Sequence, residues 1–133
     1  MKIKIISLVI LFVILLSACG NIDGESLNGT SWELVVINNR HPIEGSTITI
    51  SFKDGQVSGS SGCNSFSGEY QVRGKKIEFG MMMSTLMACV DPAMMEQETA
   101  FMQYFGNTQR FELVDGQLQF FGSGDEALMF IPR

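Results

Sequence analysis

The stretch Gly55-Gln-Val-Ser-Gly-Ser-Ser-Gly-Cys-Asn-Ser-Phe-Ser-Gly-Glu-Tyr70 decides the fold, because its pattern changes halfway along. Small residues crowd around Gly62-Cys63-Asn64, and aromatic or apolar residues then alternate with small or polar ones from Phe66 to Val72. Glycines inside a strand pattern mark a bulge or a close approach of two backbones. The stretch therefore predicts a tight, glycine-bent corner that leads into a strand.

The first 18 residues have the pattern of a lipoprotein signal peptide. Residues 5–16 are almost purely apolar, and this run of about a dozen residues is shorter than the roughly 20 needed to cross a bilayer. Leu16-Ser17-Ala18-Cys19 follows as a lipobox. We expect cleavage before Cys19, lipidation of its thiol, and a short polar tether over residues 19–26.

Export places the remaining cysteines, Cys63 and Cys89, in a compartment where disulfides persist. Because Cys19 is expected to carry lipid, these two can pair with none left over. The closed loop of about 27 residues would stabilise the fold by about 3.5 kcal/mol in a chain-entropy treatment. The alternative is a reactive thiol, which needs a nearby base, and His41 is the only histidine.

The charge balance limits the kinds of partner. The chain has 133 residues, and without Lys2 and Lys4 seven basic residues remain against fourteen acidic ones. An acidic surface argues against nucleic acid and against anionic membrane surfaces. We expect one domain over residues 27–133, a monomer, attached to the membrane by acyl chains such as palmitate.

Short strands dominate the domain. Alternating apolar residues predict strands at 32–36, 47–52, 65–72, 75–79 and 127–131, near Val57, and around Phe111 and Leu118. In the first of these, Trp32, Leu34 and Val36 should face the core. Hairpin turns are predicted at Asp54-Gly55, Arg73-Gly74 and Asp115-Gly116, and residues 81–87 should continue as an extended apolar segment.

One helix is strongly indicated. Asp91 is a suitable N-cap, Pro92 suits the first helical position, and Val90 and Met95 occupy the positions of a hydrophobic staple. Gly106-Asn107 should end the helix. The predicted apolar stripe consists of Met94, Met95, Phe101, Met102 and Phe105.

These elements predict an α+β domain. About eight short strands, joined mainly by hairpins, should form a strongly curved antiparallel β-sheet, a partial barrel, with one helix packed against it. Closing the sheet toward a barrel would also remove exposed edges.

Four motifs carry a family resemblance: Leu27-x-Gly29-Thr30-x-Trp32-x-Leu34, Gly59-x-x-Gly62-Cys63-Asn64-x-Phe66-x-Gly68-x-Tyr70, Thr85-x-Met87-Ala88-Cys89 and Glu98-x-x-Phe101. Together they resemble the META domain, also called the HslJ-like domain, over residues 27–131. The resemblance implies a small bacterial envelope protein, often a lipoprotein, with some members linked to heat shock or motility. It also implies a curved sheet with a helix, similarity to the pilot lipoproteins that escort secretins, and no agreed enzymatic activity.

The triple methionine Met81-Met82-Met83 departs from the family pattern. With Met87 it could bind Cu(I), which prefers thioether ligands. Alternation along a strand would place Met82 opposite its neighbours, however, and methionine commonly fills gaps in cores. We therefore expect packing, with an apolar groove lined by Met, Phe and Tyr104 as another use of these side chains.

The polar residues indicate no catalytic set, cofactor or metal site. His41 is expected to be a solvated loop residue, so the serines near the corner lack a partner for a triad. Asn64 is expected to satisfy its own backbone in a turn. Charge at the helix end and solvation should account for Glu69, Glu96 and Glu98, and Asp54, Asp115 and Asp125 have no calcium-loop spacing.

The sequence thus predicts a non-enzymatic, lipid-anchored protein of the cell envelope, facing the periplasm or exterior. It would bind or stabilise an envelope partner, or contribute to envelope stress resistance, through an apolar groove or a sheet edge. The alternative is a binder of a small apolar ligand or lipid in a groove between sheet and helix.

Overall fold

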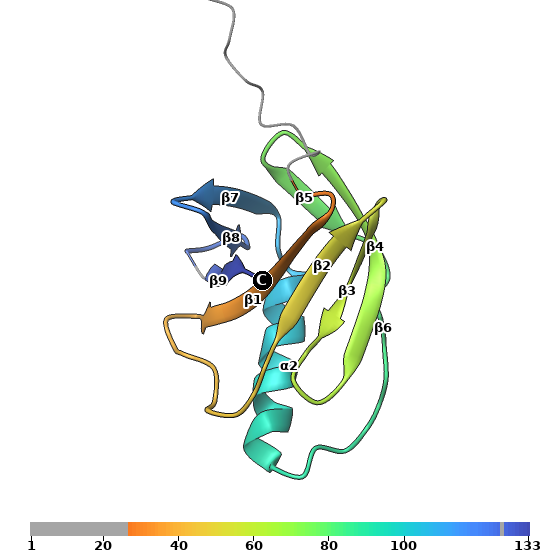
Figure 1. Ribbon diagram of the computed structural model, residues 1–133, viewed down its shortest axis with the longest axis vertical. Coiled ribbons are helices and arrows are strands. Elements are labelled where there is room, and N and C mark those ends of the chain that lie inside the picture. Colours follow the sequence, from red (N-terminus) through yellow and green to blue (C-terminus); the bar gives the residue numbers. More distant parts are fainter. Residues whose placement is uncertain (1–26, 126) are drawn as a thin grey trace, which may run out of the picture.

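A computed structural model describes residues 27–125 and 127–133 of the chain (Figure 1). The predicted signal peptide, the tether and Cys19 lie outside the described residues. The elements are β1 (Thr30–Ile37), β2 (Thr49–Lys53), β3 (Gln56–Ser60), β4 (Ser65–Arg73), β5 (Lys76–Phe79), β6 (Met83–Ser84), α2 (Pro92–Gly106), β7 (Arg110–Val114), β8 (Gln117–Phe121) and β9 (Ala127–Pro132). No helix in these two ranges is long and apolar enough to span a membrane.

The strands form an uneven ring. Their order is β3-β2-β1-β9-β8-β7-β5-β4, and a further pairing of β3 with β4 closes the ring of eight strands. The remaining strand, β6, lies outside the ring and among the described strands pairs only with β4, through Phe66 with Ser84 and Ser67 with Met83. The curved antiparallel sheet with one helix over the described residues is as predicted, and β6 is an added edge strand.

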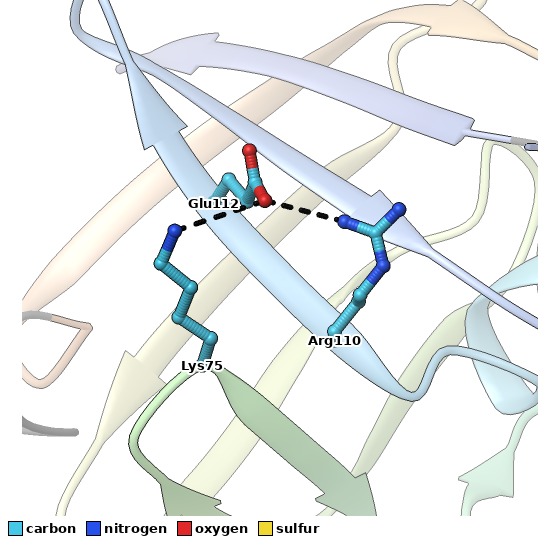
Figure 2. A network of polar contacts seen from close by, with 3 residues as sticks. All are labelled: Lys75, Arg110 and Glu112. Atoms are coloured by element: carbon cyan, nitrogen blue, oxygen red, sulfur yellow. Dashed lines mark hydrogen bonds and ion pairs between the residues drawn. The ribbon is translucent and has the colours of Figure 1, made fainter.

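The strand pairing in the ring is shortest between β5 and β7. A single bridged pair, Lys76 and Arg110, joins these strands. Figure 2 shows the side chains above this seam: Glu112 lies 3.3 Å from the Arg110 guanidinium and 3.8 Å from Lys75 Nζ. Because all three side chains are partly exposed, each ion pair contributes at most about 1 kcal/mol.

The hairpin turns follow local turn chemistry. Asp54-Gly55 has φ values of 51° and 78°, and Asp115-Gly116 has 51° and 77°, so both predicted turns are confirmed. The predicted Arg73-Gly74 turn was one residue early. Arg73 still pairs with Lys76, and Gly74, with φ of 62°, begins the turn.

The first strand contains a bulge that the alternation could not show. The register of β1 against β9 shifts between Leu34 and Val36. The next residue buried after Leu34 is therefore Ile37, and the predicted inward position of Val36 was wrong. A bulge adds one residue to one strand of the pair, which moves every later side chain to the opposite face.

Helix α2 begins and ends where predicted. The Asp91 side chain accepts a hydrogen bond from the Ala93 amide, Pro92 opens the helix, and Asn107 follows its last residue. The hydrophobic staple was wrong, because Val90 is fully exposed and Met95 is 46% exposed. Only Phe101 and Phe105 of the predicted stripe are buried.

The core lies between the inner face of the ring and α2. Phe105 stacks on Phe79 at 4.2 Å between ring centroids and meets Phe66 edge-on at 5.3 Å. Phe101 lies 5.8 Å from Phe66. Phe66 is the second residue of β4, close after the corner, so the aromatic core fixes the corner against the helix.

Candidate functional site

The predicted corner holds the carboxylate of a residue from the helix. Glu98 Oε2 accepts hydrogen bonds from Ser61 Oγ at 2.9 Å, the Cys63 amide at 3.1 Å and the Asn64 amide at 2.8 Å. Its other oxygen, Oε1, accepts one from Asn64 Nδ2 at 2.5 Å. Consecutive backbone amides at a glycine bend commonly form a concave anion site, and here a side chain of the same chain fills it.

These bonds set the acidity of Glu98. Partial burial by itself would raise the pKa of the Glu98 carboxyl, but hydrogen bonds from Asn64, Ser61 and Cys63 outweigh burial, and the pKa lies below its ordinary value. The prediction that solvation and helix-end charge account for Glu98 was therefore wrong. Glu98 lies in the second turn of α2, so the carboxylate joins the corner to the helix.

Asn64 joins the corner to a second distant segment. Its side-chain oxygen accepts hydrogen bonds from Thr85 Oγ1 at 2.8 Å and the Met87 amide at 2.7 Å, while Nδ2 donates to the Met87 carbonyl at 3.2 Å. The Asn64 residue is 4% exposed. The prediction that Asn64 satisfies its own backbone was wrong, because its amide group is used by residues more than twenty positions away.

The predicted disulfide between Cys63 and Cys89 is present, with 5.7 Å between the Cα atoms. It links the same two segments that Asn64 links, so the corner and the residues before α2 are joined by covalent and hydrogen bonds. His41 lies elsewhere, in the connection from β1 to β2, with Nδ1 3.0 Å from the Val35 carbonyl oxygen. The alternative of a reactive thiol beside His41 is not what the structure shows.

The remaining motif residues form two groups. At the start of β1, the Gly29 amide donates to Phe52 O at 2.7 Å, and Thr30 Oγ1 donates to Leu27 O while accepting from Trp32 Nε1. Beside the corner, Gly62 has φ of 115°, and a Cβ on Gly68 would lie 2.5 Å from Met82 Sδ. Ala88 and the side chain of Met87 are exposed.

The segment held by the corner exposes its apolar side chains. Six of the eight large apolar residues that are exposed in the described part of the chain lie between positions 81 and 95. We call these six the apolar strip: Met81, Met83, Leu86, Met87, Val90 and Met95. The sequence signal for the strip was present, but the packing expected for the methionines is found only at Met82, which is packed against the core.

The strip lies in an acidic part of the chain. Residues 77–109 contain Glu78, Asp91, Glu96 and Glu98 and no lysine, arginine or histidine. Glu78, Asp91 and Glu96 are exposed. Exposed apolar side chains are therefore accompanied by exposed acidic ones along this part of the chain.

A cleft of about 690 Å³ separates the β1–β2 connection from α2. Its lining includes Ile37, Arg40, His41, Glu96 and Tyr104, and it contains neither Met nor Phe. Asn38 Nδ2 donates to the Tyr104 hydroxyl oxygen at 2.8 Å across the cleft. A groove between sheet and helix thus exists, but of the predicted lining by Met, Phe and Tyr104 only Tyr104 is found, and the other apolar side chains that line it are Ile37, Ile43, Ala93 and Ala100.

Comparisons with known proteins agree with the architecture. A protein from Burkholderia xenovorans solved by NMR is 27% identical, with a TM-score of 0.70 over 82% of this chain and 85% of that one. A second NMR structure (23% identity, TM-score 0.67, 80% and 92% covered) and a crystal structure of a DUF4847 family protein from Bacteroides vulgatus (14%, 0.56, 80% and 93%) share the fold. No curated protein matches the chain.

The family model of the META domain matches residues 25–133 of this chain. That range contains the corner, the disulfide, α2 and every strand of the ring. The resemblance drawn from the four motifs is thereby confirmed, and the chain belongs to the META domain family.

Proposed function

We propose that this protein is a lipid-anchored, non-enzymatic component of the cell envelope that binds and stabilises a partner protein through the apolar strip. The observation that carries the proposal is the concentration of exposed apolar side chains between positions 81 and 95. Large exposed apolar patches on soluble domains commonly mark interaction surfaces. Through its partner, the protein would contribute to the stress resistance of the envelope.

The way the strip is held supports binding. Asn64 and the disulfide fix the backbone around Met87 and Cys89, although the side chains there contribute little to the core. Ordering an exposed segment costs conformational entropy, of about 1–2 kcal/mol per residue for the backbone. A surface that is ordered before binding does not incur that cost when the partner arrives.

The position of the strip favours a protein partner over the membrane to which the chain is anchored. Figure 1 shows β1 beginning at one end of the molecule, beside the β2–β3 turn, with the segment before α2 at the other end. The Asn28 side chain accepts a hydrogen bond from the Asp54 amide in that turn. An anchor that precedes residue 27 would therefore hold the molecule by the end opposite the segment before α2.

The charge around the strip defines the partner further. The acidic residues at 78, 91 and 96 would repel an anionic lipid surface and attract basic groups. The partner would present an apolar segment flanked by lysine or arginine. An extended segment would also pair with the outer edge of β6, since β6 pairs only with β4 among the described strands.

The lipid anchor is supported by the lipobox and can be tested separately from partner binding. The lipobox ending at Cys19 predicts acylation, and two or three acyl chains suffice for stable attachment. Mass spectrometry of the N-terminal peptide should find a diacylglyceryl group on Cys19, and Cys19→Ala should remain unprocessed. An N-terminal peptide without a diacylglyceryl group, or normal cleavage of Cys19→Ala, would contradict the anchor.

Crosslinking in cells tests the binding surface. A photoreactive residue at Leu86 or Val90 should yield a discrete crosslinked protein, and the same residue at Val114 or Ile131 should not. Val114 and Ile131 are matched controls, because they are exposed apolar residues outside the strip. The product from position 86 should be lost on Val90→Lys, since the added positive charge opposes a basic partner.

The absence of a specific product at positions 86 and 90, or an identical product at 114, would overturn the proposed surface. An identical result from chains anchored normally and from Cys19→Ala would show that binding does not need the anchor. These two outcomes separate the anchor from the binding function.

A second candidate function is binding of a small polar ligand in the cleft. The observation that favours it is the pair of opposite charges on the two walls, Arg40 on the β1–β2 connection and Glu96 on α2. The volume of the cleft lies within the range usual for small-ligand sites. Ligand-observed NMR with a set of zwitterionic amino acids should detect binding that weakens in Arg40→Gln, and uniform absence of binding would remove this candidate.

A further inference from the structure

The disulfide and the carboxylate of Glu98 belong to one cluster of metal-ligating groups. Cys63 Sγ, Cys89 Sγ and a Glu98 carboxylate oxygen lie within 4.8 Å of one another. We propose that, when the disulfide is reduced, these three residues bind a thiophilic divalent cation, for which Zn²⁺ is the best match. This inference goes beyond the proposed partner binding and does not depend on it.

The backbone around the cluster suits a shared cation. The Cα atoms of Cys63 and Cys89 are 5.7 Å apart, so a change of side-chain rotamer lets the two sulfurs separate around one ion without movement of the main chain. All three residues are partly exposed, which leaves a path for the ion. Zinc commonly takes thiolate and carboxylate ligands in tetrahedral sites, with water as a fourth ligand when the protein supplies three.

Glu98 is oriented in advance. Its Oε2 already accepts three hydrogen bonds, whereas among the described residues Oε1 accepts one, from Asn64 Nδ2. Each carboxylate oxygen has two lone pairs in the plane, so Oε1 keeps one for a cation. Groups that hold a ligand from behind increase metal affinity, and Asn64 and Ser61 take this role here.

Charge also favours a cation. Two thiolates and one carboxylate would carry three negative charges in a small space. Neither of the ion pairs among the described residues involves Glu98, and residues 77–109 contain no basic side chain. A bound divalent cation would neutralise most of this charge.

The metal and the disulfide exclude each other. A dithiol reductant delivers two electrons and two protons to the S–S bond, which breaks to give two thiols while the reductant becomes a disulfide. A divalent cation then displaces the two thiol protons and binds the thiolates. The same dithiol form exists before the disulfide first forms, so the site is available in the newly made chain.

Spectroscopy of the full chain in detergent tests the site. Co²⁺ added to the reduced protein should give one equivalent of tetrahedral cobalt with a thiolate charge-transfer band, and Zn²⁺ should displace it. The oxidised protein should show neither signal. Glu98→Gln should weaken Zn²⁺ binding by about tenfold or more, whereas Glu96→Gln, on the same helix and outside the cluster, should leave it unchanged.

Cys63→Ser and Cys89→Ser should each remove the cobalt band, and Cys19→Ser should not. Because the cysteine variants could fail to fold, the reduced parent protein supplies the deciding measurement. No stoichiometric cobalt band in reduced, folded parent protein would overturn the site. Equal binding by oxidised and reduced protein, or binding retained in the double variant at positions 63 and 89, would place any metal elsewhere and also overturn it.

Discussion

The corner at residues 61–64 and the apolar strip adjoin each other, yet they satisfy opposite physical requirements. In the corner, buried Ser61 and Asn64 and partly buried Glu98 find polar partners and are joined by short hydrogen bonds. In the strip, large apolar side chains remain in water, with Leu86 at 96% exposed. The comparison shows that the polar network holds in place a backbone whose side chains do not stabilise the domain.

Loss of the disulfide that joins the corner to the strip should have the largest effect on stability. Reduction, or Cys63→Ser, should lower the free energy of unfolding by about 3.5 kcal/mol and the melting temperature by about 10–20 °C, because the unfolded chain regains the entropy of the open loop. Thermal melts under oxidising and reducing conditions measure the effect. Equal melting temperatures under the two conditions would contradict a stabilising role for the bridge.

Removal of the carboxylate charge in the corner should have the next largest effect. Glu98→Gln should lower the free energy of unfolding by about 1–3 kcal/mol, because amide and hydroxyl donors lose a charged acceptor. Urea unfolding at neutral pH measures this value, and Glu96→Gln is the matched control because Glu96 is exposed on the same helix.

Glu98→Gln also tests how the stability of the domain depends on pH. Since the folded pKa of Glu98 is below its unfolded value, its contribution to stability is fully present above the unfolded pKa and is lost as pH falls through the folded pKa. The stability difference between parent and Glu98→Gln should therefore shrink in acid. A difference that stayed constant from neutral to acidic pH would argue that the charge on Glu98 is not the cause.

Crowding around Gly68, beside the residues that precede β6, should destabilise the domain about as much as Glu98→Gln. A Cβ at position 68 would lie 2.5 Å from Met82 Sδ and 2.9 Å from the Met81 carbonyl oxygen. Gly68→Ala should cost about 1–3 kcal/mol through overpacking. Combining it with Met82→Ala should recover only part of this loss, because the Met81 contact is with backbone. Full recovery in the double variant would show that the side chain alone limits the space.

The smallest effect on stability is expected in the strip itself. Leu86→Ser and Val90→Ser should change the free energy of unfolding by less than about 0.5 kcal/mol, because neither side chain is buried. Leu86→Ser should abolish the crosslinked product from a photoreactive residue at position 90, and Val90→Ser should abolish the product from position 86. A marked loss of stability in either variant would mean that the strip is covered within the monomer.

Local chemistry explains which features could be predicted. Asp54-Gly55, Asp115-Gly116 and Asp91-Pro92 act through their own backbone angles and nearest neighbours, so the turns and the helix start were predictable. The β1 bulge was not, because the partner strand β9 is almost one hundred residues later and the register depends on both.

Contacts between distant residues explain what was missed at the site. Glu98 meets Asn64 across 34 positions, and each residue alone has an ordinary explanation, as a helix-surface acid and as a turn former. The exposure of Met81 and Leu86 was equally hidden, because an apolar residue in a strand pattern gives no sign of whether another element covers it.

The amino-acid sequence by itself determined the curved antiparallel class, the helix after Asp91, the family and the pairing of Cys63 with Cys89. These depend on alternation, turn chemistry, motif spacing and a cysteine count, all of which are written along the chain. Only the tertiary structure decided that Glu98 fills the corner and that the strip stays uncovered. The physical reason is that hydrogen-bond partners and burial depend on what folding brings together, and neither is encoded in the neighbours along the chain.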